Sequence, residues 1–310
     1  MNRNGAYQGV ILAAGHGSRL GPFGERHPKP VLPICNRPLL AYQLDTMRAA
    51  GITDVVIVIG HLGHIITQTL ADGTDYGVRI RYVEQEKRLG IAHAVGQLER
   101  HLDRPFLLLL GDIFFDINDL PAMFQAFEQP GTAAVLAVKD EPDEAAIRRN
   151  FAVLLNDDGT VRRVVEKPRH ISNSLKGCGL YLFDLSIFDA IRRTPRTALR
   201  DEYELTDSIQ ILIDYEYRVR IAPVVEWDLN ITFVDDLLAC CLHELSRREE
   251  NSVVAPDAQI AEGSELIDSV IGPGVIIENP TRLERCVVLS GVKLAGGTQY
   301  QDQVFAEDTP

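Results

Sequence analysis

The sequence predicts an α/β fold, in which a mostly parallel mixed sheet flanked by helices is followed by a short C-terminal left-handed β-helix. Three observations support this prediction. Short β-branched apolar runs alternate with helical patterns between residues 9 and 138, several of these runs end at a glycine, and apolar residues recur every six positions after residue 253. Continuous apolar strands that alternate with helices are typical of a parallel sheet covered on both faces.

The amino-terminal elements follow from this alternation. Strands are expected at residues 10–14, 55–59, 78–83, 106–110 and 133–138, and helices at residues 39–50, 64–70 and 91–102. The first helix stops at Gly51, a typical C-terminal signal. Ligands of such sheets bind beyond the carboxyl ends of the strands, and both Gly15 and Asp112 follow such an end.

The pattern loosens after residue 151. A hairpin is expected from residues 152–155 and 161–165, a strand at residues 180–183, and helices at residues 207–215 and 234–248. Thr206 is the expected N-cap of the first of these helices. The charged stretch at residues 247–252 marks a boundary, which divides the chain into a large domain at 1–248 and a tail at 249–310.

The tail shows a different periodicity. Val254, Ile260 and Leu266 are spaced by six, and after one step of five the spacing continues through Ile271, Ile277, Leu283 and Leu289. Six-residue apolar spacing is typical of a β-helix, here of about two coils. The alternative is a small β-sheet with coincidental spacing. Either form would serve oligomerisation or capping, and we expect a homo-oligomer.

Charge and composition exclude several classes of function. The chain has 310 residues with 31 Lys and Arg against 44 Asp and Glu, so its net charge is −13. Such a chain is a poor binder of nucleic acid or of an anionic membrane. Its apolar runs are too short to span a bilayer, its five cysteines form no CxxC pair, and no secretory segment is evident. We therefore expect a cytoplasmic protein with reduced thiols.

A glycine-rich loop is the strongest motif. It carries Ala14, Gly15, Gly17 and Ser18, and the cations Arg19 and Lys29 follow. Glycines after a buried strand let backbone N–H groups approach anionic oxygens, so the loop can hold a triphosphate. A Rossmann fingerprint needs a third glycine where Leu20 stands, and the Gly-Lys-Ser/Thr of a Walker A loop is missing. The alternative is a plain turn with surface cations.

This loop and the Pro-Lys-Pro-Val-Leu-Pro segment at residues 28–33 resemble the signature of sugar-1-phosphate nucleotidyltransferases, among them the glucose-1-phosphate thymidylyltransferases and uridylyltransferases. The resemblance covers most of residues 9–245. It implies a Rossmann-like nucleotidyltransferase fold and an enzyme that uses a nucleoside triphosphate and a sugar-1-phosphate. It also implies that Arg19 and Lys29 act on the phosphate groups.

The segment at residues 84–94 resembles the base-recognition loop of that family, with Gln85 and Gly90 at the matching places. A Gln amide offers a donor and an acceptor to the edge of uracil or thymine. Gly90 would let a base lie against the backbone. The alternative is a solvated loop that starts a helix with a glycine.

Asp112 follows a buried strand, and the resemblance makes it the catalytic metal aspartate. Hard oxygen ligands of this kind suit Mg²⁺. The second ligand is open: counting back from Asp236 favours Asn230, whereas counting forward from Trp227 leaves Asp228 as a candidate. The alternative is that Asp112 only caps a turn.

The resemblance places the sugar-phosphate site at Glu166 and Lys167, with Gly179 and Tyr181 lining the pocket. Lys167 would hold the phosphate of the sugar as a point charge and is counted as catalytic with Arg19 and Lys29. Ala152 stands where the family often has glycine, so a backbone contact survives in a tighter pocket. The alternative is an exposed Glu-Lys pair.

The expected reaction is nucleotidyl transfer from dTTP or UTP to a sugar-1-phosphate with release of pyrophosphate, dependent on Mg²⁺. Transfer from GTP is one alternative. Another is a non-catalytic regulatory subunit that binds sugar nucleotides, which the presence of Asp112, Arg19, Lys29 and Lys167 disfavours. A β-helix acyltransferase is disfavoured because the tail is short and has no histidine after His243.

Overall fold

The computed structural model describes residues 5–15, 17–20, 22–198 and 201–306, without the side chains of residues 18, 22 and 23. By its internal contacts the chain forms two compact units. The first unit comprises Met1–Gly15 and Gln43–Asp228, and the second comprises His16–Tyr42 and Leu229–Pro310. Each unit is described by itself. The domain limits at residues 248 and 249 stay a prediction.

A mixed sheet organises the first unit. Its strands are β1 (Gln8–Ala13), β4 (Asp54–Ile59), β5 (Arg79–Glu84), β6 (Phe106–Leu110), β8 (Thr132–Asp140), β9 (Phe151–Leu155), β10 (Val161–Glu166), β11 (Leu175–Phe183) and β12 (Arg218–Ala222). Their order is β10-β9-β11-β6-β1-β4-β5, and β8 pairs with both β11 and β12. Strands β6, β1, β4 and β5 run parallel, whereas β11 is antiparallel to β6.

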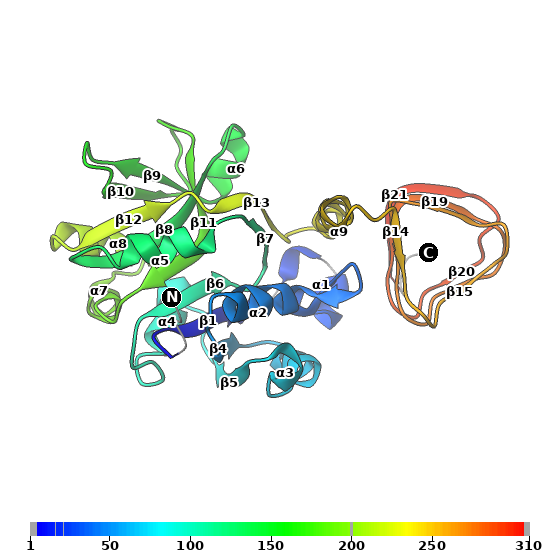
Figure 1. The fold of residues 1–310 in the computed structure, drawn as a ribbon, viewed down its shortest axis with the longest axis horizontal. Coiled ribbons are helices and arrows are strands. Elements are labelled where there is room, and N and C mark those ends of the chain that lie inside the picture. The colour runs from blue at the N-terminus through cyan, green and yellow to red at the C-terminus, as the bar shows by residue number, and fades with distance from the viewer. Residues whose placement is uncertain (1–4, 16, 21, 199–200, 307–310) are drawn as a thin grey trace. The chain divides into compact units, whose positions relative to one another are not determined.

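Helices lie on both faces of this sheet (Figure 1). They are α2 (Leu39–Ala49), α3 (Gly63–Leu70), α4 (Ile91–Gly96), α5 (Leu120–Phe127), α6 (Glu144–Arg149), α7 (Ile187–Arg193) and α8 (Leu205–Asp214). Val10 and Ile11 are successive residues of β1 that point to opposite faces, and both are fully buried. One face packs its core with α4, α7 and α8. This arrangement confirms the predicted doubly covered sheet.

Short elements complete the description. They are the 3₁₀ turns at Ser18–Leu20, Lys29–Val31 and Thr74–Tyr76, helix α1 (Pro22–Arg26), and strands β2 (Pro33–Ile34), β3 (Arg37–Pro38), β7 (Ile113–Ile117) and β13 (Val225–Asn230). Strand β7 pairs with β13, and β2 pairs with β3. The sequence did not predict β7, β12 or β13.

The tail in the second unit is a β-helix, as predicted. Its strands are β14 (Ser252–Val254), β15 (Gln259–Ile260), β16 (Glu265–Ile267), β17 (Ser269–Ile271), β18 (Ile276–Ile277), β19 (Arg282–Val288), β20 (Lys293–Leu294) and β21 (Gln299–Phe305). All pair in parallel, each residue with one 17 positions later, as Val253 does with Val270. Figure 1 shows the coils almost end-on, in orange to red.

The 17-residue coil corrects two details of the prediction. Described coils begin at Ser252, Ser269 and Cys286, so the tail has three coils rather than two. Val288, not Leu289, lies opposite Ile271, because the step of five recurs once in every coil. The handedness of the coil stays a prediction.

Helix α9 (Val234–Arg248) has the predicted limits. Two other helices differ from expectation. The helix predicted at residues 91–102 ends as α4 at Gly96 and continues as turns. Helix α8 begins at Leu205 with Glu204 as its N-cap, so the assignment of Thr206 as the cap was wrong. None of the helices in the described ranges has both the length and the apolar character that crossing a membrane requires.

Candidate active site

The loops that follow β1, β4, β5 and β6 share one edge of the sheet. The parallel registers place Ala13 beside Ile59, Ile59 beside Glu84, and Leu12 beside Leu110. Parallel strands end together, so the segments that carry Gly15, Gln85 and Asp112 leave the sheet side by side. The sequence predicted this convergence for Gly15 and Asp112.

Backbone packing is tight where β6 meets β1. The Gly111 N–H donates to the Leu12 carbonyl over 2.9 Å. A Cβ at Gly111 would lie 2.8 Å from that same carbonyl oxygen, and one at Gly60 would lie 3.0 Å from the Ala14 oxygen. The distance at Gly111 is shorter than real Cβ contacts allow, so this position requires glycine, and the distance at Gly60 is tighter than most such contacts. The close approach fixes where the chain turns into Asp112, which is half-buried.

Gln43 holds the turn that carries Asp112. This side chain from α2 is 2% exposed, and its Nε2 donates to the carbonyls of Leu110 and Ile113, each over 2.9 Å. The two carbonyls flank Gly111 and Asp112, so one amide clamps both ends of the turn. Sequence reasoning missed Gln43. The only signal was a polar residue within the apolar pattern of a helix.

Gln85 is buried at the start of the second loop, 7% exposed. Its Nε2 lies 3.4 Å from Nδ1 of His93, and the His93 ring stacks on Tyr203 with centroids 6.3 Å apart. Burial, together with nearby Lys87, lowers the pKa of His93 below its usual value, which favours the neutral ring. A neutral Nδ1 can accept from the Gln85 amide. His93 therefore orients Gln85, a role that its sequence position did not reveal.

Gly90 has a structural reason to be glycine. Its φ is +106°, and a Cβ there would lie 2.4 Å from the carbonyl oxygen of Tyr203. The Tyr203 N–H donates to the Leu89 carbonyl over 2.7 Å, and the Ala92 N–H donates to the Tyr203 carbonyl over 3.0 Å. The segment around Tyr203 thus locks the loop next to Gln85. A base contact at Gly90 stays a prediction.

Glu166 and Lys167 follow β10. The Thr206 hydroxyl donates to Glu166 Oε2 over 3.3 Å, and Lys167 Nζ lies 3.6 Å from Glu166 Oε1. Lys167 has a φ of +43° and donates its backbone N–H to the Asn150 carbonyl over 2.8 Å. Its side chain is 45% exposed. Thr206 thus positions the Glu166 carboxylate instead of capping its helix.

The other predicted sugar-pocket residues lie in the core. Tyr181 is 3% exposed and stacks between Phe151 and Phe183. Burial, reinforced by Glu166, raises its pKa well above the usual range. Gly179 has a φ of +69°, and a Cβ there would lie 2.6 Å from Ile113 Cδ1. Ala152 is 3% exposed and stands between Val165 and Lys176 in the sheet.

Asp228 belongs to a buried cluster of four charges. Both of its carboxylate oxygens accept from Lys176 Nζ, over 2.8 and 2.9 Å. Lys139 Nζ lies 3.5 Å from Asp228 and 3.0 Å from Glu141, and Lys176 lies 3.5 Å from Glu141. The Asp228 and Lys176 side chains are 1% and 3% exposed. The cluster was not evident in the sequence, because its members are far apart in the chain.

The pKa shifts reflect this pairing. Burial opposes both charges, but the hydrogen bonds from Lys139 and the Asp143 N–H, together with the charges of Lys139 and Lys176, outweigh it and lower the pKa of Glu141. The same contacts, with Asp228, raise the pKa of Lys139. Burial and nearby Asp228 raise the pKa of the neighbouring Cys178 thiol well above its usual range. The shifts in the pKa of Glu141 and Lys139 both favour the charged forms, and both oxygens of Asp228 accept hydrogen bonds from Lys176.

Arg19, Lys29 and Asn230 belong to the second unit. Gly17 has a φ of +68°, and the Lys29 stem lies 3.5 Å from where its Cβ would be. Arg19 is exposed and Lys29 is half-buried. Gly17 and Lys29 therefore lie close together within the second unit. The Ser18 side chain and His16 lie outside the described residues.

Asn230 ends β13 and is half-buried. The Thr232 hydroxyl donates to its carbonyl over 3.4 Å, and the Thr232 and Phe233 N–H groups both donate to Asp236 Oδ2 over 2.7 Å. Asp236 therefore fixes the turn between Asn230 and α9. This gives the Asp236 of the sequence motif a structural role at the start of a helix.

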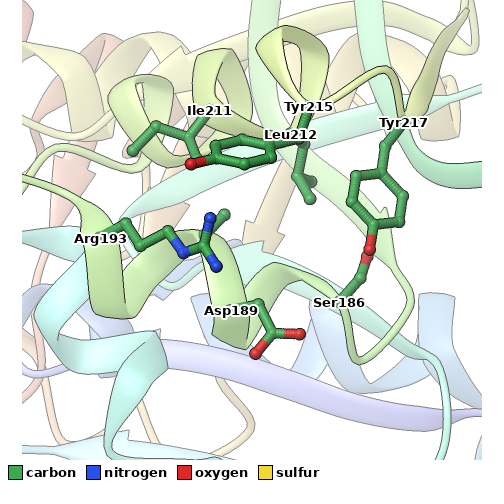
Figure 2. Close-up of a pocket in the computed structure, with 8 residues that line it drawn as sticks. Ser186, Asp189, Arg193, Ile211, Leu212, Tyr215 and Tyr217 are labelled. Atoms are coloured by element: carbon green, nitrogen blue, oxygen red, sulfur yellow. The ribbon is translucent and has the colours of Figure 1, made fainter.

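A cavity of about 210 Å³ between α7 and α8 contains none of the predicted site residues. Figure 2 shows the Arg193 guanidinium between the Tyr215 ring and the Asp189 carboxylate. The Arg193 Cζ lies 4.6 Å from the centroid of that ring. The contact with Tyr215 is a cation–π contact at an exposed surface, and it does not involve the loops at the sheet edge.

Comparison with known proteins agrees with this geometry. The model of the nucleotidyl transferase family matches residues 8–227. A glucose-1-phosphate thymidylyltransferase of Streptomyces antibioticus is 32% identical over 283 residues, which make up 87% of this chain and 78% of that protein. A mannose-1-phosphate guanyltransferase of Eremothecium gossypii is 28% identical over 276 residues, 85% of this chain and 71% of that protein.

Solved structures show the same fold. The crystal structure of a UDP-glucose pyrophosphorylase complexed with UDP-glucose superposes with a TM-score of 0.67. The superposition covers 78% of this chain and 99% of that one at 20% identity. The likeness at this identity concerns the fold, and it confirms the sheet and helix arrangement predicted from the sequence.

Proposed function

Because this chain belongs to the nucleotidyl transferase family, as a sugar-1-phosphate nucleotidyltransferase, we propose that it uses dTTP or UTP and requires Mg²⁺. One observation carries the proposal: the glycine-rich loop after β1, the buried Gln85 after β5 and the clamped Asp112 after β6 leave one sheet edge together. Ligands of open α/β sheets bind at such an edge.

The chemistry is an in-line displacement at the α-phosphorus. An oxygen of the sugar-1-phosphate forms the new P–O bond as the bond to pyrophosphate breaks. The nucleophile is already an anion, so no general base is needed and catalysis rests on positioning and charge neutralisation. Arg19 and Lys29 neutralise the triphosphate in this proposal, and Lys167 binds the phosphate of the sugar.

The described residues fit Mg²⁺ better than a transition metal. No three histidine, cysteine, aspartate or glutamate side chains in the described ranges gather as a metal site. Mg²⁺ usually binds one or two protein oxygens and takes substrate phosphates and water for the rest. When bound, it would neutralise charge on the phosphates. Asp112 would hold it, and Asn230 remains the predicted second ligand because Lys176 already occupies both oxygens of Asp228.

Gln85 supports the choice of a pyrimidine. One Nε2–H of its amide faces His93, which leaves Oε1 and the second N–H for a ligand. Oε1 can accept from N3–H of thymine or uracil, and the N–H can donate to the neighbouring carbonyl. Adenine offers the opposite pattern at these positions. The held orientation of Gln85 therefore favours dTTP and UTP over ATP.

Glu166 supports a sugar at the neighbouring position. Thr206 contacts one oxygen of the Glu166 carboxylate and Lys167 contacts the other. The carboxylate is therefore held in place and can accept from sugar hydroxyls. Guanylyl transfer is the second candidate, because a mannose-1-phosphate guanyltransferase is among the relatives. Guanine also carries an N–H next to a carbonyl, so Gln85 alone does not separate it from a pyrimidine.

The test is a screen of pyrophosphate release with Mg²⁺, in which the four common nucleoside triphosphates and dTTP are combined with a panel of sugar-1-phosphates. We expect the highest kcat/KM with dTTP or UTP. A higher value with GTP would establish the guanylyl alternative, and a higher value with ATP would overturn the assignment of Gln85. A protein without release in any combination would act as the binding subunit instead.

We predict that Asp112→Ala lowers kcat about a thousandfold or more while the fold stays intact, because the metal loses its carboxylate ligand. Asp116→Ala is the matched control, since it alters a half-buried aspartate on β7 beyond the turn. Thermal melting and pyrophosphate release measure both variants. Activity of Asp112→Ala within about tenfold of wild type would contradict the metal role.

A further inference from the structure

A basic cavity lies at the amino-terminal ends of the parallel strands of the same sheet. It has a volume of about 540 Å³ and is lined by Gln8, Asp54, Arg79, Arg81 and the segment Arg100, His101, Leu102, Asp103 and Arg104. Gln8, Asp54 and Arg79 are the first residues of β1, β4 and β5. The strands are parallel and rise about 3.3 Å per residue, so six residues put roughly 20 Å between this cavity and the Gly15 edge.

Three guanidinium groups converge on one carboxylate in this cavity. Arg79, Arg81 and Arg104 approach the oxygens of Asp54 to 3.6, 3.5 and 3.3 Å. The Asp54 side chain is 15% exposed and also accepts from Gln8 Nε2 over 3.1 Å. Gln8 Oε1 in turn accepts from the Asp103 N–H over 3.1 Å. Asp54 and Gln8 thus form a fixed floor beneath the arginines.

The arginines of the cavity offer more N–H donors than the carboxylate of Asp54 can accept. Each guanidinium carries five N–H donors, whereas a carboxylate offers about four lone-pair sites. Arg81 and Arg104 also donate to the carbonyls of His101 and Gly5, over 3.3 and 2.8 Å. Arg79 and Arg81 are nevertheless 76% and 44% exposed, so part of each guanidinium is accessible to solvent. The other acid at the rim, Asp103, is 80% exposed and pairs with Arg104. This excess stands out in a chain of net charge −13.

Strand geometry aims the two exposed arginines the same way. Arg79 and Arg81 flank the buried Ile80 on β5, and residues two apart on a strand point to the same face. Their planar guanidiniums can bind phosphate oxygens in pairs. The fixed floor keeps them close together in the free protein, so binding would cost little rearrangement.

We propose that this cavity is an anion site for a small molecule that carries one or two phosphate groups, separate from the nucleotide-binding edge. The chemistry is shared by free phosphate, pyrophosphate and phosphorylated metabolites. The polar, arginine-rich lining disfavours an apolar ligand, and the cavity is too small for a folded partner. The site does not depend on which nucleotide the enzyme uses.

The experiment is calorimetric titration of the full chain with inorganic phosphate, pyrophosphate and a sugar-1-phosphate. Three double variants accompany the wild type. Arg79→Ala with Arg81→Ala removes the proposed site, and Arg19→Ala with Lys29→Ala removes the proposed triphosphate contacts. Arg162→Ala with Arg163→Ala is the matched control, because these arginines are also exposed on an edge strand.

We expect the affinity of one class of sites to fall about tenfold or more in the Arg79/Arg81 variant. The same class should keep its wild-type affinity in the Arg19/Lys29 and control variants. Without added anion, the Arg79/Arg81 variant should keep wild-type kcat/KM. The three ligands identify the source, because a site for free phosphate binds all of them, whereas one for a metabolite prefers the sugar-1-phosphate.

Asp54→Asn provides a test of opposite sign. It removes the competing carboxylate with little change of shape, so the anion should bind several-fold more tightly. Equal binding by wild type and the Arg79/Arg81 variant would overturn the proposal, as would weaker binding by a folded Asp54→Asn. If the Arg19/Lys29 variant lost neither class of sites, the proposed triphosphate contacts would be wrong, and the anion site at Arg79 and Arg81 would still stand.

Discussion

Gln43 is the residue on which the position of Asp112 depends most directly. Its amide reaches across to two carbonyls that are 67 and 70 positions away in the chain. The turn at Gly111 and Asp112 has its own sequence signal, but nothing local in the sequence says what holds it. Long-range side-chain contacts of this kind are what sequence reasoning lacks, and the roles of Gln43 and Thr206 were missed for that reason. The contact of His93 with Gln85 spans eight positions, and it was missed because the sequence does not show which way the two side chains point.

We predict that Gln43→Ala lowers kcat about tenfold and raises the Mg²⁺ concentration needed for half-maximal activity, because two buried carbonyls lose a donor at about 1 kcal/mol each. The metal dependence separates positioning from a loss of stability. Gln68→Ala, an exposed glutamine on α3, is the control. A folded Gln43→Ala with wild-type metal dependence would show that the turn holds its shape without the clamp.

The buried pair of Lys176 and Asp228 gives a second prediction. Removing one partner leaves an uncompensated buried charge, so Lys176→Met should lower the free energy of unfolding by about 3–5 kcal/mol. Adding Asp228→Asn should recover most of this loss, because Lys139 and Glu141 still neutralise each other. Urea denaturation measures both variants. A double variant as unstable as the single one would mean that the pair is not electrostatically coupled.

Substitutions at Asp228 and Asn230 also test which of the two residues is the second Mg²⁺ ligand. If Lys176 occupies Asp228, then Asp228→Asn should change stability but not the Mg²⁺ dependence of the rate, whereas Asn230→Ala should change the Mg²⁺ dependence. The sequence could not decide between these two residues, because counting from either side gave a different answer. The ion pair supplies a physical reason to prefer Asn230.

Helix α9 contacts both the segment near Tyr42 and the tail within the second unit. Glu244 is fully buried on this helix and accepts from Arg247 and Arg248 over 2.7–2.9 Å. Arg248 also donates to the Tyr42 hydroxyl over 2.9 Å, which donates to the Ile34 carbonyl. The sequence predicted α9 to the residue, because its apolar spacing is regular, but not this network.

Glu244 should make stability depend on pH. Burial alone would raise its pKa, but the hydrogen bonds from Arg247 and Arg248 outweigh burial and lower it from 4.5. A depressed folded pKa stabilises the protein above the unfolded pKa, and the contribution is lost as pH falls through the folded pKa. Wild type should therefore melt higher than Glu244→Gln at pH 7. A gap that does not close below about pH 4 would contradict this assignment.

The apolar periodicity of the tail predicted its fold but not its number of coils. Six-residue spacing predicted the β-helix because apolar rows turn inward in that fold. Ile271, Ile277 and Leu283 are buried, whereas Ile260 is half-buried and Val254 is 43% exposed. Glu262, Glu265 and Glu278 are exposed. The number of coils was underestimated because the repeat of the five-residue step was missed, and with it the rows at Val288 and Leu294 in the third coil. Pairing, not hydropathy, defines that coil.

Within the second unit as a whole, the tail packs against chain segments that precede it by more than two hundred residues. The Asn36 amide donates to the Ile271 carbonyl over 2.8 Å. In α9, which leads into the tail, the Cys241 carbonyl accepts from the Cys35 thiol over 3.5 Å. Ser269, Val270 and Ile271 are all buried, so strand β17 is covered on both sides. The tail is therefore an integral part of this unit.

Truncation after Arg248 tests that conclusion. Helix α9 packs against β19 and β21 of the tail, so truncation would expose the apolar surface between them, and about 25 cal/mol of stabilisation would be lost for each Å² exposed. We expect the truncated protein to melt several degrees lower and to self-associate, with a smaller effect on kcat. Asn36→Ala should lower the melting temperature less, since it removes one hydrogen bond. Light scattering gives the mass per particle and a thermal scan gives the stability. If both were unchanged by truncation, the tail would be a passive appendage, and the homo-oligomer that we predict would have to form through the remaining chain.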